Sequence, residues 1–261
     1  MKHKDHYNDA YIVELSQKIL SVMPQFEAQK FCVMLQGNLE DKELFARLDC
    51  IVDAMVKTMG SDYTQNIQSF FHLLGEELEK AEGMFSFGYW LFPISRYVER
   101  YGNTNWQVSL NFIKELTKRF TGEYAIRPIL REHPKEVMDE LILWSKDSNV
   151  HIRRLASEGV RIHLPWSPKL LVALDEFEKY AMILTNLKDD SQKFVQKSVG
   201  NNLNDLFKES PQKAQTLIAQ WRQSGASKAC EWIIKHGERN QNKNQQKRRR
   251  GNKWHRVFIP S

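Results

Sequence analysis

Two stretches of this chain share one residue pattern at a constant offset, and this feature constrains the fold more than any other. Residues 147–162 can be laid over residues 190–205 with a shift of 43. Under that shift Arg154 falls on Lys197, and apolar residues fall on apolar residues. Both stretches begin with an Asp-containing turn and continue as a basic amphipathic helix. The chain therefore contains at least two copies of one helical unit.

The length of this repeat indicates the architecture. A period of about 40 to 47 residues with two helices per unit is typical of HEAT-like solenoids. Solenoids stack helix pairs into a curved body with a concave face, and basic helices on that face would form a groove for a long polyanion. We predict an all-α fold, a HEAT-like helical-repeat solenoid with a concave basic face. Because the identity between the two copies is low, a bundle of unrelated helices is the alternative.

Helical periodicity extends over the rest of the chain, because apolar residues recur three and four positions apart in nearly every segment. The predicted helices cover residues 10–22, 42–59, 106–120, 126–131, 134–145, 170–186, 192–207, 211–223 and 226–235. Pro134 and Pro211 are typical of prolines that open a helix in its first turn. Strand patterning is weak: residues 84–92 alternate aromatic residues only briefly, and we interpret them as a loop and a helix start near Pro93 rather than as a strand.

The composition excludes several classes of protein. A chain of 261 residues with 27% charged and 41% hydrophobic residues is typical of globular proteins. No run of about 18 apolar residues exists to span a membrane, and no apolar signal core follows the N-terminus. The cysteines at 32, 50 and 230 form neither a disulfide framework nor a metal-ligand spacing. We expect a cytoplasmic protein without a metal or a cofactor.

The positive charge is concentrated near the C-terminus. Residues 235–256 contain nine basic residues and one acid, a net charge of +8; since the whole chain carries +6, the remainder carries −2. The end of this segment is too polar to fold alone. It can attract nucleic acid by releasing counterions from phosphates, or it can serve only solubility. We predict one HEAT-like domain over residues 1–238 and a flexible basic tail over residues 239–261.

The most informative motif covers residues 149–166, which we predict to form one helix ending at Pro165. Arg154, Glu158 and Arg161 recur at i, i+4 and i+7, so their side chains project from one face. Two cations flanking one carboxylate suit a phosphate-rich ligand. Trp166 follows the helix and could contact that ligand or pack against the next repeat.

Three carboxylates stand out by their context: Glu123, Glu158 and Asp205. Each alone could be an ordinary helix cap or salt-bridge residue. A catalytic interpretation requires that all three converge in one groove, which spacing does not show. The sequence contains no glycine-rich phosphate loop, no Cys/His metal cluster and no nucleophile elbow.

The chain resembles a known family through its central motif, which reads N-x-H-I-R-R-L-A-S-E-G-x-R-x-x-L-P-W over residues 149–166. Supporting segments are residues 92–102, 123–128 and 198–205. Through these residues it resembles the HEAT-like DNA alkylation repair glycosylases, and within them the AlkC-like branch of the AlkC/AlkD superfamily. The likeness covers most of residues 20–236 and leaves out the tail.

The resemblance implies a monofunctional DNA N-glycosylase. Such an enzyme hydrolyses the N-glycosidic bond of cationic alkylated purines, such as N3-methyladenine, and leaves an abasic site. The charged base leaves readily, and the oxocarbenium ion that forms on the sugar needs a nearby carboxylate. Family members bend the duplex and use no deep base-flipping pocket. The implied partner is alkylated double-stranded DNA, bound in the nucleoid by a monomer that needs no cofactor or metal.

The resemblance also assigns roles to residues. Glu123 matches the catalytic carboxylate, and Glu158 and Asp205 match further acidic groups that line the site. The remaining matches are predicted to bind DNA: Tyr124, where members usually carry Phe, Arg127, Arg154, Arg161 and Trp166. Lys197, the counterpart of Arg154 in the repeat, is predicted to bind DNA as well. His163 stands where members often carry a second basic residue or a proline, so its role is open.

Two other classes of function stay open. One is a non-catalytic binder of bent or branched DNA on the same scaffold, and the other is a helical-repeat scaffold for protein interactions. Members of the first class tend to lack the catalytic acids, all three of which are present here. Release of base from methylated DNA separates the three possibilities.

Overall fold

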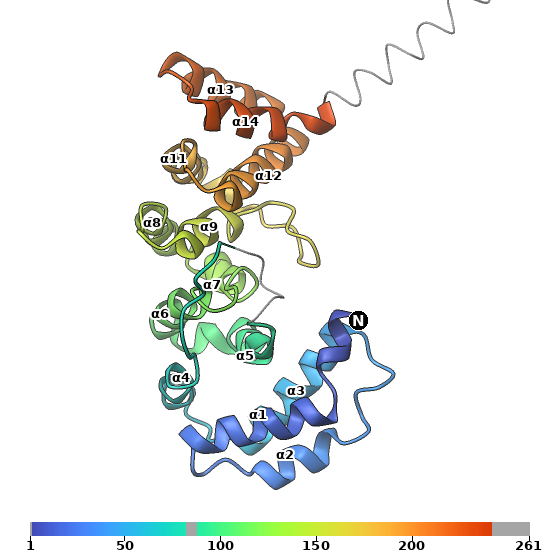
Figure 1. Cartoon of the computed structure of the whole chain (residues 1–261). Helices are drawn as coiled ribbons and strands as arrows, with labels where there is room; N and C mark the ends of the chain where they lie inside the picture. The colour runs from blue at the N-terminus through green and yellow to red at the C-terminus, as the bar shows by residue number, and fades with distance from the viewer. Residues whose placement is uncertain (1, 82–87, 242–261) are drawn as a thin grey trace, which may run out of the picture. The chain divides into compact units, whose positions relative to one another are not determined.

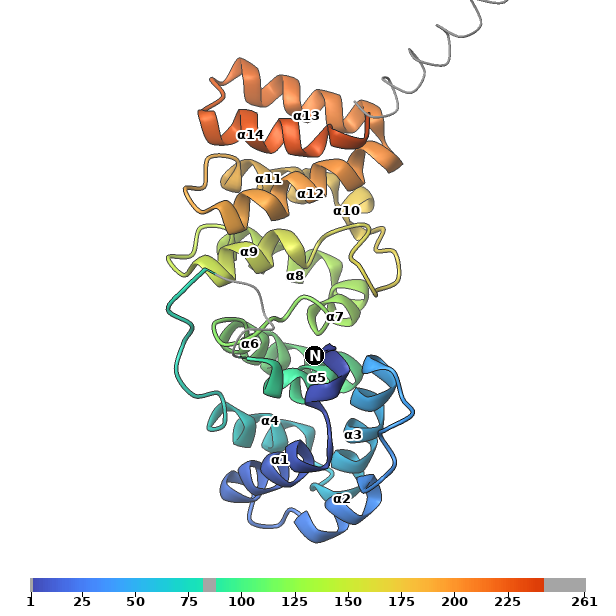
Figure 2. The ribbon, with the colours of Figure 1, turned by 45° about the vertical axis from the view of Figure 1, so that its right-hand side comes forward.

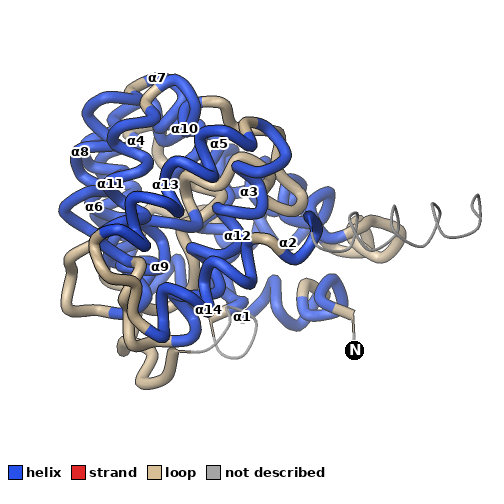
Figure 3. The backbone as a smooth tube through the Cα atoms, turned by 90° about the horizontal axis from the view of Figure 1, so that it is seen from above, coloured by secondary structure: helices blue, strands red, loops and turns tan. Residues whose placement is uncertain are grey.

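The computed structural model describes residues 2–81 and 88–241. Every regular element in these ranges is helical, as the backbone trace shows (Figure 3). The described residues form fourteen α-helices and three short 3-10 helices. The predicted all-α fold is therefore confirmed. No helix in the described ranges is long and apolar enough to cross a membrane.

The chain divides into two compact units, Met1–Val137 and Met138–Ser261. We describe each unit by itself, and the single domain predicted over residues 1–238 stays a prediction. The predicted basic tail falls almost entirely on residues 242–261, which lie outside the described residues.

The first unit is a set of helices of 7 to 15 residues (Figure 1). They are α1 (Asp9–Val22), α2 (Ala28–Leu35), α3 (Leu44–Thr58), α4 (Tyr63–Phe71), α5 (Phe92–Tyr101), α6 (Trp106–Thr117) and α7 (Ile126–Glu132). Helix α2 packs between α1 and α3, and α3 also packs against α5. Helices α2 and α4, of 8 and 9 residues, were not predicted, because apolar periodicity is a weak signal over fewer than about 11 residues.

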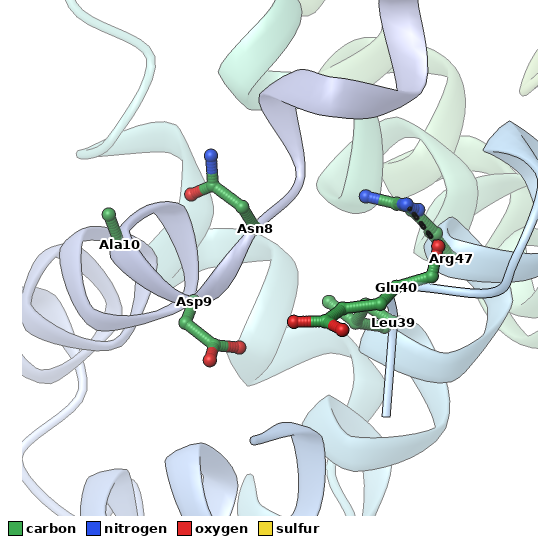
Figure 4. A pocket seen from close by; sticks show the side chains of 6 residues that line it. All are labelled: Asn8, Asp9, Ala10, Leu39, Glu40 and Arg47. Atoms are coloured by element: carbon green, nitrogen blue, oxygen red, sulfur yellow. Dashed lines mark hydrogen bonds between the residues drawn. The ribbon is translucent and has the colours of Figure 1, made fainter. Parts of the chain in front are cut away.

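A small hollow in the first unit, of about 290 Å³, lies beside the start of α1 (Figure 4). Its lining residues are Asn8, Asp9, Ala10, Leu39, Glu40 and Arg47. The Arg47 guanidinium is committed to the backbone, since it donates to the carbonyl oxygens of Lys4, Tyr7, Glu40 and Lys42 at 2.8–3.0 Å. Arg47 therefore ties the N-terminal segment to the start of α3, and none of the predicted site residues lines this hollow.

The second unit consists of successive helix pairs (Figure 2). Its elements are α8 (Pro134–Trp144), which starts just before the division, α9 (Val150–Glu158), α10 (Val172–Asp175), α11 (Phe177–Leu187), α12 (Lys193–Glu209), α13 (Pro211–Gln223) and α14 (Lys228–Gly237). Helix α12 packs between α9 and α14. Pro134 and Pro211 open α8 and α13, as predicted. The predicted helix over residues 170–186 is divided into α10 and α11 at Glu176, whose backbone is not helical.

The predicted repeat is present in the helix boundaries. Helices α8 and α9 begin at Pro134 and Val150, and α11 and α12 begin at Phe177 and Lys193. Each helix of the second pair therefore begins 43 residues after its counterpart in the first pair.

The repeat extends to hydrogen bonds in the turns that open α9 and α12. The backbone N–H of Asn149 donates to Asp147 Oδ1 at 2.9 Å, and the N–H of Gln192 donates to Asp190 Oδ1 at 2.8 Å. Arg153 Nη1 donates to the Asp147 carbonyl at 2.9 Å. Its counterpart in the repeat, the Gln196 side chain, donates to the Asp190 carbonyl at 2.7 Å. The aspartates of the two turns thus have the same structural role.

The end of α9 also differs from the prediction, because α9 ends at Glu158 rather than continuing to Pro165. Gly159, at the C-cap, is a weak helix former. The residues that follow make contacts outside the helix: Arg161 reaches Asp205 of α12, and the N–H of Leu170 donates to the Ile162 carbonyl at 3.1 Å. Arg161 therefore lies in the loop after α9 rather than on the helix face that the spacing indicated.

Candidate functional site

Three of the predicted residues form a buried ionic cluster between the C-terminal end of α9 and the middle of α12. Arg161 Nη1 lies 2.9 Å from Glu158 Oε1, and Arg161 Nε lies 3.1 Å from Asp205 Oδ2. The exposed fractions of the Arg161, Glu158 and Asp205 side chains are only 9%, 7% and 2%. One guanidinium therefore bridges two carboxylates that are both removed from solvent.

Small polar side chains complete this cluster. Ser198 Oγ of α12 donates to Glu158 Oε2 at 2.6 Å, and Ser157 Oγ lies 2.7 Å from Ser198 Oγ. The Asn202 amide donates to the backbone carbonyls of Ser157 and Ser198 at 2.8 and 3.0 Å. These three residues are buried, so they join α9 and α12 through a polar network that water does not reach.

Asp205 also anchors the segment that follows α9. Its Oδ2 accepts a hydrogen bond from the backbone N–H of His163 at 3.3 Å, and its Oδ1 lies 3.4 Å from Lys208 Nζ. The His163 ring adds a second tie, since its Nε2 lies 2.7 Å from Glu209 Oε1. His163, whose role the sequence left open, thus fixes the loop to α12.

The charges of the cluster hold Glu158 in its ionised form. Burial raises the pKa of Glu158, but the positive charges of Arg154 and Arg161 and the hydrogen bond from Ser198 outweigh it, and the net pKa is lower than usual. Burial likewise lowers the pKa of Arg161, whereas Glu158 and Asp205 raise it, and the net shift is upward. Near neutral pH Glu158 and Arg161 are therefore both charged, and Glu158 is not an acid that could donate a proton.

Arg154 stands at the edge of the cluster. Its Nη2 lies 3.7 Å from Glu158 Oε1, and its guanidinium lies over the Phe194 ring, 4.8 Å from the ring centroid. The side chain is half-buried, so unlike Arg161 it reaches the surface. Glu158 is thus flanked by two cations, as its spacing predicted, of which only Arg154 is accessible.

Trp166 lies in the loop that follows the cluster. Its side chain is 63% exposed, and its φ of 59° falls in the left-handed region. A bulky residue adopts that conformation at a cost, and such strain concentrates at functional sites. The loop therefore presents an aromatic ring toward solvent from a base that Asp205 and Glu209 hold.

Glu123 and its neighbours belong to the first unit, in the turn between α6 and α7. The backbone N–H of Glu123 donates a hydrogen bond to Thr121 Oγ1 at 3.3 Å, and Glu123 is 3% exposed. The Tyr124 ring stacks on Phe92 at 5.9 Å and meets Phe45 edge-on at 5.7 Å. Arg127, in the first turn of α7, is 1% exposed. Glu123 and Arg127, four residues apart in the sequence, are therefore both buried, and Tyr124 between them belongs to an aromatic cluster.

The remaining prediction, Lys197, is an exposed residue on α12. Ser157, Ser198 and Asn202 were not predicted, although the sequence contains one signal for them. Ser198, Asn202 and Asp205 recur at i, i+4 and i+7 on α12, the same spacing that singled out Arg154, Glu158 and Arg161. In residues 2–81 and 88–241, no group of three or more His, Cys, Asp or Glu side chains is arranged to hold a metal ion.

Comparison with known proteins identifies the family. The sequence pattern of the family described as "DNA alkylation repair enzyme" matches residues 101–247, more than half of the chain. The chain belongs to this family. The matched region includes Glu123 and the whole ionic cluster, and the resemblance predicted from the motif is confirmed.

Two relatives extend this finding. The chain is 32% identical over 239 residues to the uncharacterized protein YhaZ of Bacillus subtilis (strain 168), covering 90% of this chain and 63% of YhaZ. Its structure is similar to that of the alkylpurine DNA glycosylase AlkC of Pseudomonas fluorescens, solved bound to DNA containing an abasic site analog. The TM-score is 0.79 at 29% identity, over 92% of this chain and 64% of the other. The chain thus spans less than two thirds of the length of either relative.

Proposed function

We propose that this protein is a DNA glycosylase that removes cationic alkylated purines from duplex DNA by hydrolysis. The observation that carries the proposal is the pair of buried carboxylates, Glu158 and Asp205, that Arg161 holds together within the region matched by the DNA alkylation repair family. Ionisable groups that are buried and held in one charge state are concentrated at functional sites.

The chemistry that such a reaction requires agrees with the charge state of this cluster. An alkylated purine already carries a positive charge, so it leaves with the electron pair of the C1′–N bond and needs no added proton. The sugar then carries positive charge at C1′ until water adds there and loses a proton. Fixed carboxylates stabilise that cation and orient the water. A lowered pKa of Glu158 suits this role, because the carboxylate stays ionised.

We assign the roles as follows. Glu123 is the catalytic carboxylate, as the resemblance implies, and Glu158 and Asp205 are supporting acids. Arg127 and Arg161 were predicted to bind DNA, but they are only 1% and 8% exposed. We therefore propose that both act within the protein, Arg161 by positioning Glu158 and Asp205. Arg154, Tyr124, Lys197 and Trp166 keep their proposed roles in DNA binding.

The proposal includes the finer features implied by the resemblance. A carboxylate does not form the Schiff base through which an amine nucleophile acts on a sugar, so we propose a monofunctional hydrolase that leaves an abasic site. The enzyme acts as a cytoplasmic monomer on alkylated double-stranded DNA and uses no cofactor.

The test is the release of N3-methyladenine from methylated duplex DNA. We expect the wild type to release the base, and Glu123→Gln to bind DNA normally while its release rate falls by about 10-fold or more. Glu231→Gln is the matched control, because this carboxylate is exposed and pairs with Arg222 at the surface. Unchanged release by Glu123→Gln refutes the assignment of Glu123.

The same assay separates the alternatives. Binding of DNA without any release of base supports a non-catalytic binder of bent or branched DNA. Neither binding nor release supports a scaffold for protein interactions.

A further inference from the structure

A row of polar side chains leads along α12 toward the ionic cluster. Lys193, Lys197, Asn201 and Asp205 recur every four residues, so they lie on one face of the helix. The row begins with two exposed lysines and ends with the buried Asp205. This face of α12 therefore runs from a basic surface to the proposed active site.

Helix α14 contributes aromatic and basic groups beside this row. The rings of Trp232 and His236 stack with their centroids 5.0 Å apart, and Lys193 Nζ lies 3.4 Å from the centroid of the Trp232 ring. His236 Nε2 lies 3.1 Å from Asn201 Oδ1. The close approach depends on Gly200, where a Cβ would lie 2.7 Å from Cδ2 of His236. We call Lys193, Lys197, His236 and Arg239 the α12–α14 basic face.

Arg239 is the most informative member of this face. Its Nη1 donates to the His236 carbonyl at 2.6 Å, and its Nη2 donates to Asn201 Oδ1 at 3.0 Å. Both acceptors are neutral, and Arg239 forms no ion pair with any carboxylate in residues 2–81 and 88–241. Burial and the nearby Arg161 lower its pKa, against an opposite effect of Asp205. Arg239 is therefore held in a fixed orientation without being neutralised.

Other arginines of the second unit contrast with this arrangement. Arg153 pairs with Asp190 at 2.7 Å and Arg222 with Glu231 at 3.1 Å, so their charges are compensated within the protein. Lys197, one turn from Asn201, likewise forms no ion pair with a described residue. Two cations on the same face are thus left for an external anion.

We propose that the α12–α14 basic face binds consecutive phosphates of one DNA strand beside the proposed active site. This proposal rests on the proposed function for its ligand, since charge complementarity with a polyanion is what the face offers. The eight residue steps from Lys193 to Asn201 span about 12 Å along α12, which is the axial rise of about three to four nucleotides of one strand. Arg239 and Lys197 make the phosphate contacts, and Lys193 extends them.

The pKa of His236 depends on whether phosphate is bound to the α12–α14 basic face. Its pKa is lowered by burial and by three cations, which are Arg239, Lys197 and Lys193. Its other close neighbours, Trp232 and Asn201, are uncharged. A bound phosphate offsets the three cations, so binding raises the pKa of His236 and DNA affinity rises as the pH falls.

The test is the salt dependence of binding to an unmodified duplex, measured by fluorescence anisotropy on the full chain. Each lost phosphate contact reduces the slope of log affinity against log salt by about 0.9. We expect Arg239→Ala and Lys197→Ala each to flatten the slope by about that amount. The control Arg222→Ala removes a cation that is already paired and leaves the slope unchanged. Equal slopes for all four proteins overturn the proposal.

Two further measurements keep the result interpretable. Lys197 is exposed, so Lys197→Ala remains a valid test if Arg239→Ala does not fold. The pKa of His236, followed by NMR, rises when duplex is added to the wild type, and an unchanged pKa contradicts the proposal.

Base release from methylated DNA separates this proposal from the proposed function. If the wild type releases no base while the two variants flatten the slope, the glycosylase assignment fails and the phosphate site stands. If the wild type releases base but the slopes are equal, the phosphate site fails and the enzyme stands.

Discussion

The two repeats, α8/α9 and α11/α12, have the same backbone arrangement but opposite uses of one position. Glu158 of α9 corresponds to Asn201 of α12 under the shift of 43. Glu158 is buried and paired with Arg161, which also pairs with Asp205, so two carboxylates share this one guanidinium. Asn201 accepts a hydrogen bond from Arg239 but leaves its charge uncompensated. The difference between a carboxylate and an amide thus separates a site suited to stabilising a cation from one suited to binding an anion.

Glu158 and Asn201 also differ in the free-energy cost of removing their side chains from water. A buried carboxylate is tolerated only with a charged partner and further hydrogen bonds, as Arg161 and Ser198 supply for Glu158. An amide needs only neutral partners. The first repeat therefore depends on its arginine for stability, whereas the second does not.

The largest effect is expected from breaking the first repeat. Arg161→Ala leaves Glu158 and Asp205 buried without their shared cation, so the free energy of unfolding falls by about 3–5 kcal/mol. In the repeat, Arg161 corresponds to Asn204, whose amide donates to the Gly237 carbonyl. Asn204→Ala is the control and costs about 1–3 kcal/mol. Urea unfolding of both variants measures the difference, and equal losses contradict the comparison.

A second prediction distinguishes the contribution of the α12–α14 basic face to DNA binding from that of residues 242–261. Residues 242–261 contain seven basic residues, so their deletion weakens DNA binding and flattens its salt dependence by about 0.9 for each cation that contacts a phosphate, up to about six units. Because the basic face acts independently, Arg239→Ala flattens the slope further in the truncated protein. An identical slope before and after truncation makes the tail irrelevant to DNA.

A third prediction concerns a substitution that makes the second repeat resemble the first. Asn201→Asp places a carboxylate against Arg239, so the guanidinium becomes paired within the protein and the salt slope flattens by about 1. Asn38→Asp adds the same charge at an exposed position in the first unit and serves as the control. Equal salt slopes for the two variants show that the charge of Arg239 is not used for DNA.

The smallest effect concerns pH. The folded-state pKa of Glu158 is lower than its unfolded value near 4.5, so its contribution to stability is complete above pH 4.5 and is lost as the pH falls through the folded pKa. Glu158→Gln removes this titration. The urea midpoint of the wild type should therefore fall more between pH 6 and pH 3.5 than that of the variant. Parallel curves contradict an ionised Glu158 in the folded protein.

Much of the fold could be predicted from local pattern. Apolar spacing located α1, α3, α6 and α13, and the shift of 43 located the two repeats. The pattern failed where tertiary contacts decide. The end of α9 depends on Arg161 leaving the helix to reach Asp205, 44 residues away, and no local signal records that contact.

The candidate site was predicted in part for the same reason. Charged residues at helical spacing indicated Glu158 and Arg161, and the family motif indicated Asp205. Spacing on one helix does not show what lies opposite, so it predicts that Arg161 binds phosphate, although Arg161 pairs with two carboxylates inside the protein. The contacts of Arg239 were missed because they join α12 to the end of α14.

The sequence by itself determined the helical class, the period of the repeat and the family, because periodicity and motifs are properties of residue order. Only the tertiary structure decided which charged side chains pair with opposite charges inside the protein. A side chain's charge is available to a ligand only if no neighbour neutralises it, and those neighbours come from other helices. That is why Arg161 and Arg239, alike in the sequence, differ in the folded chain.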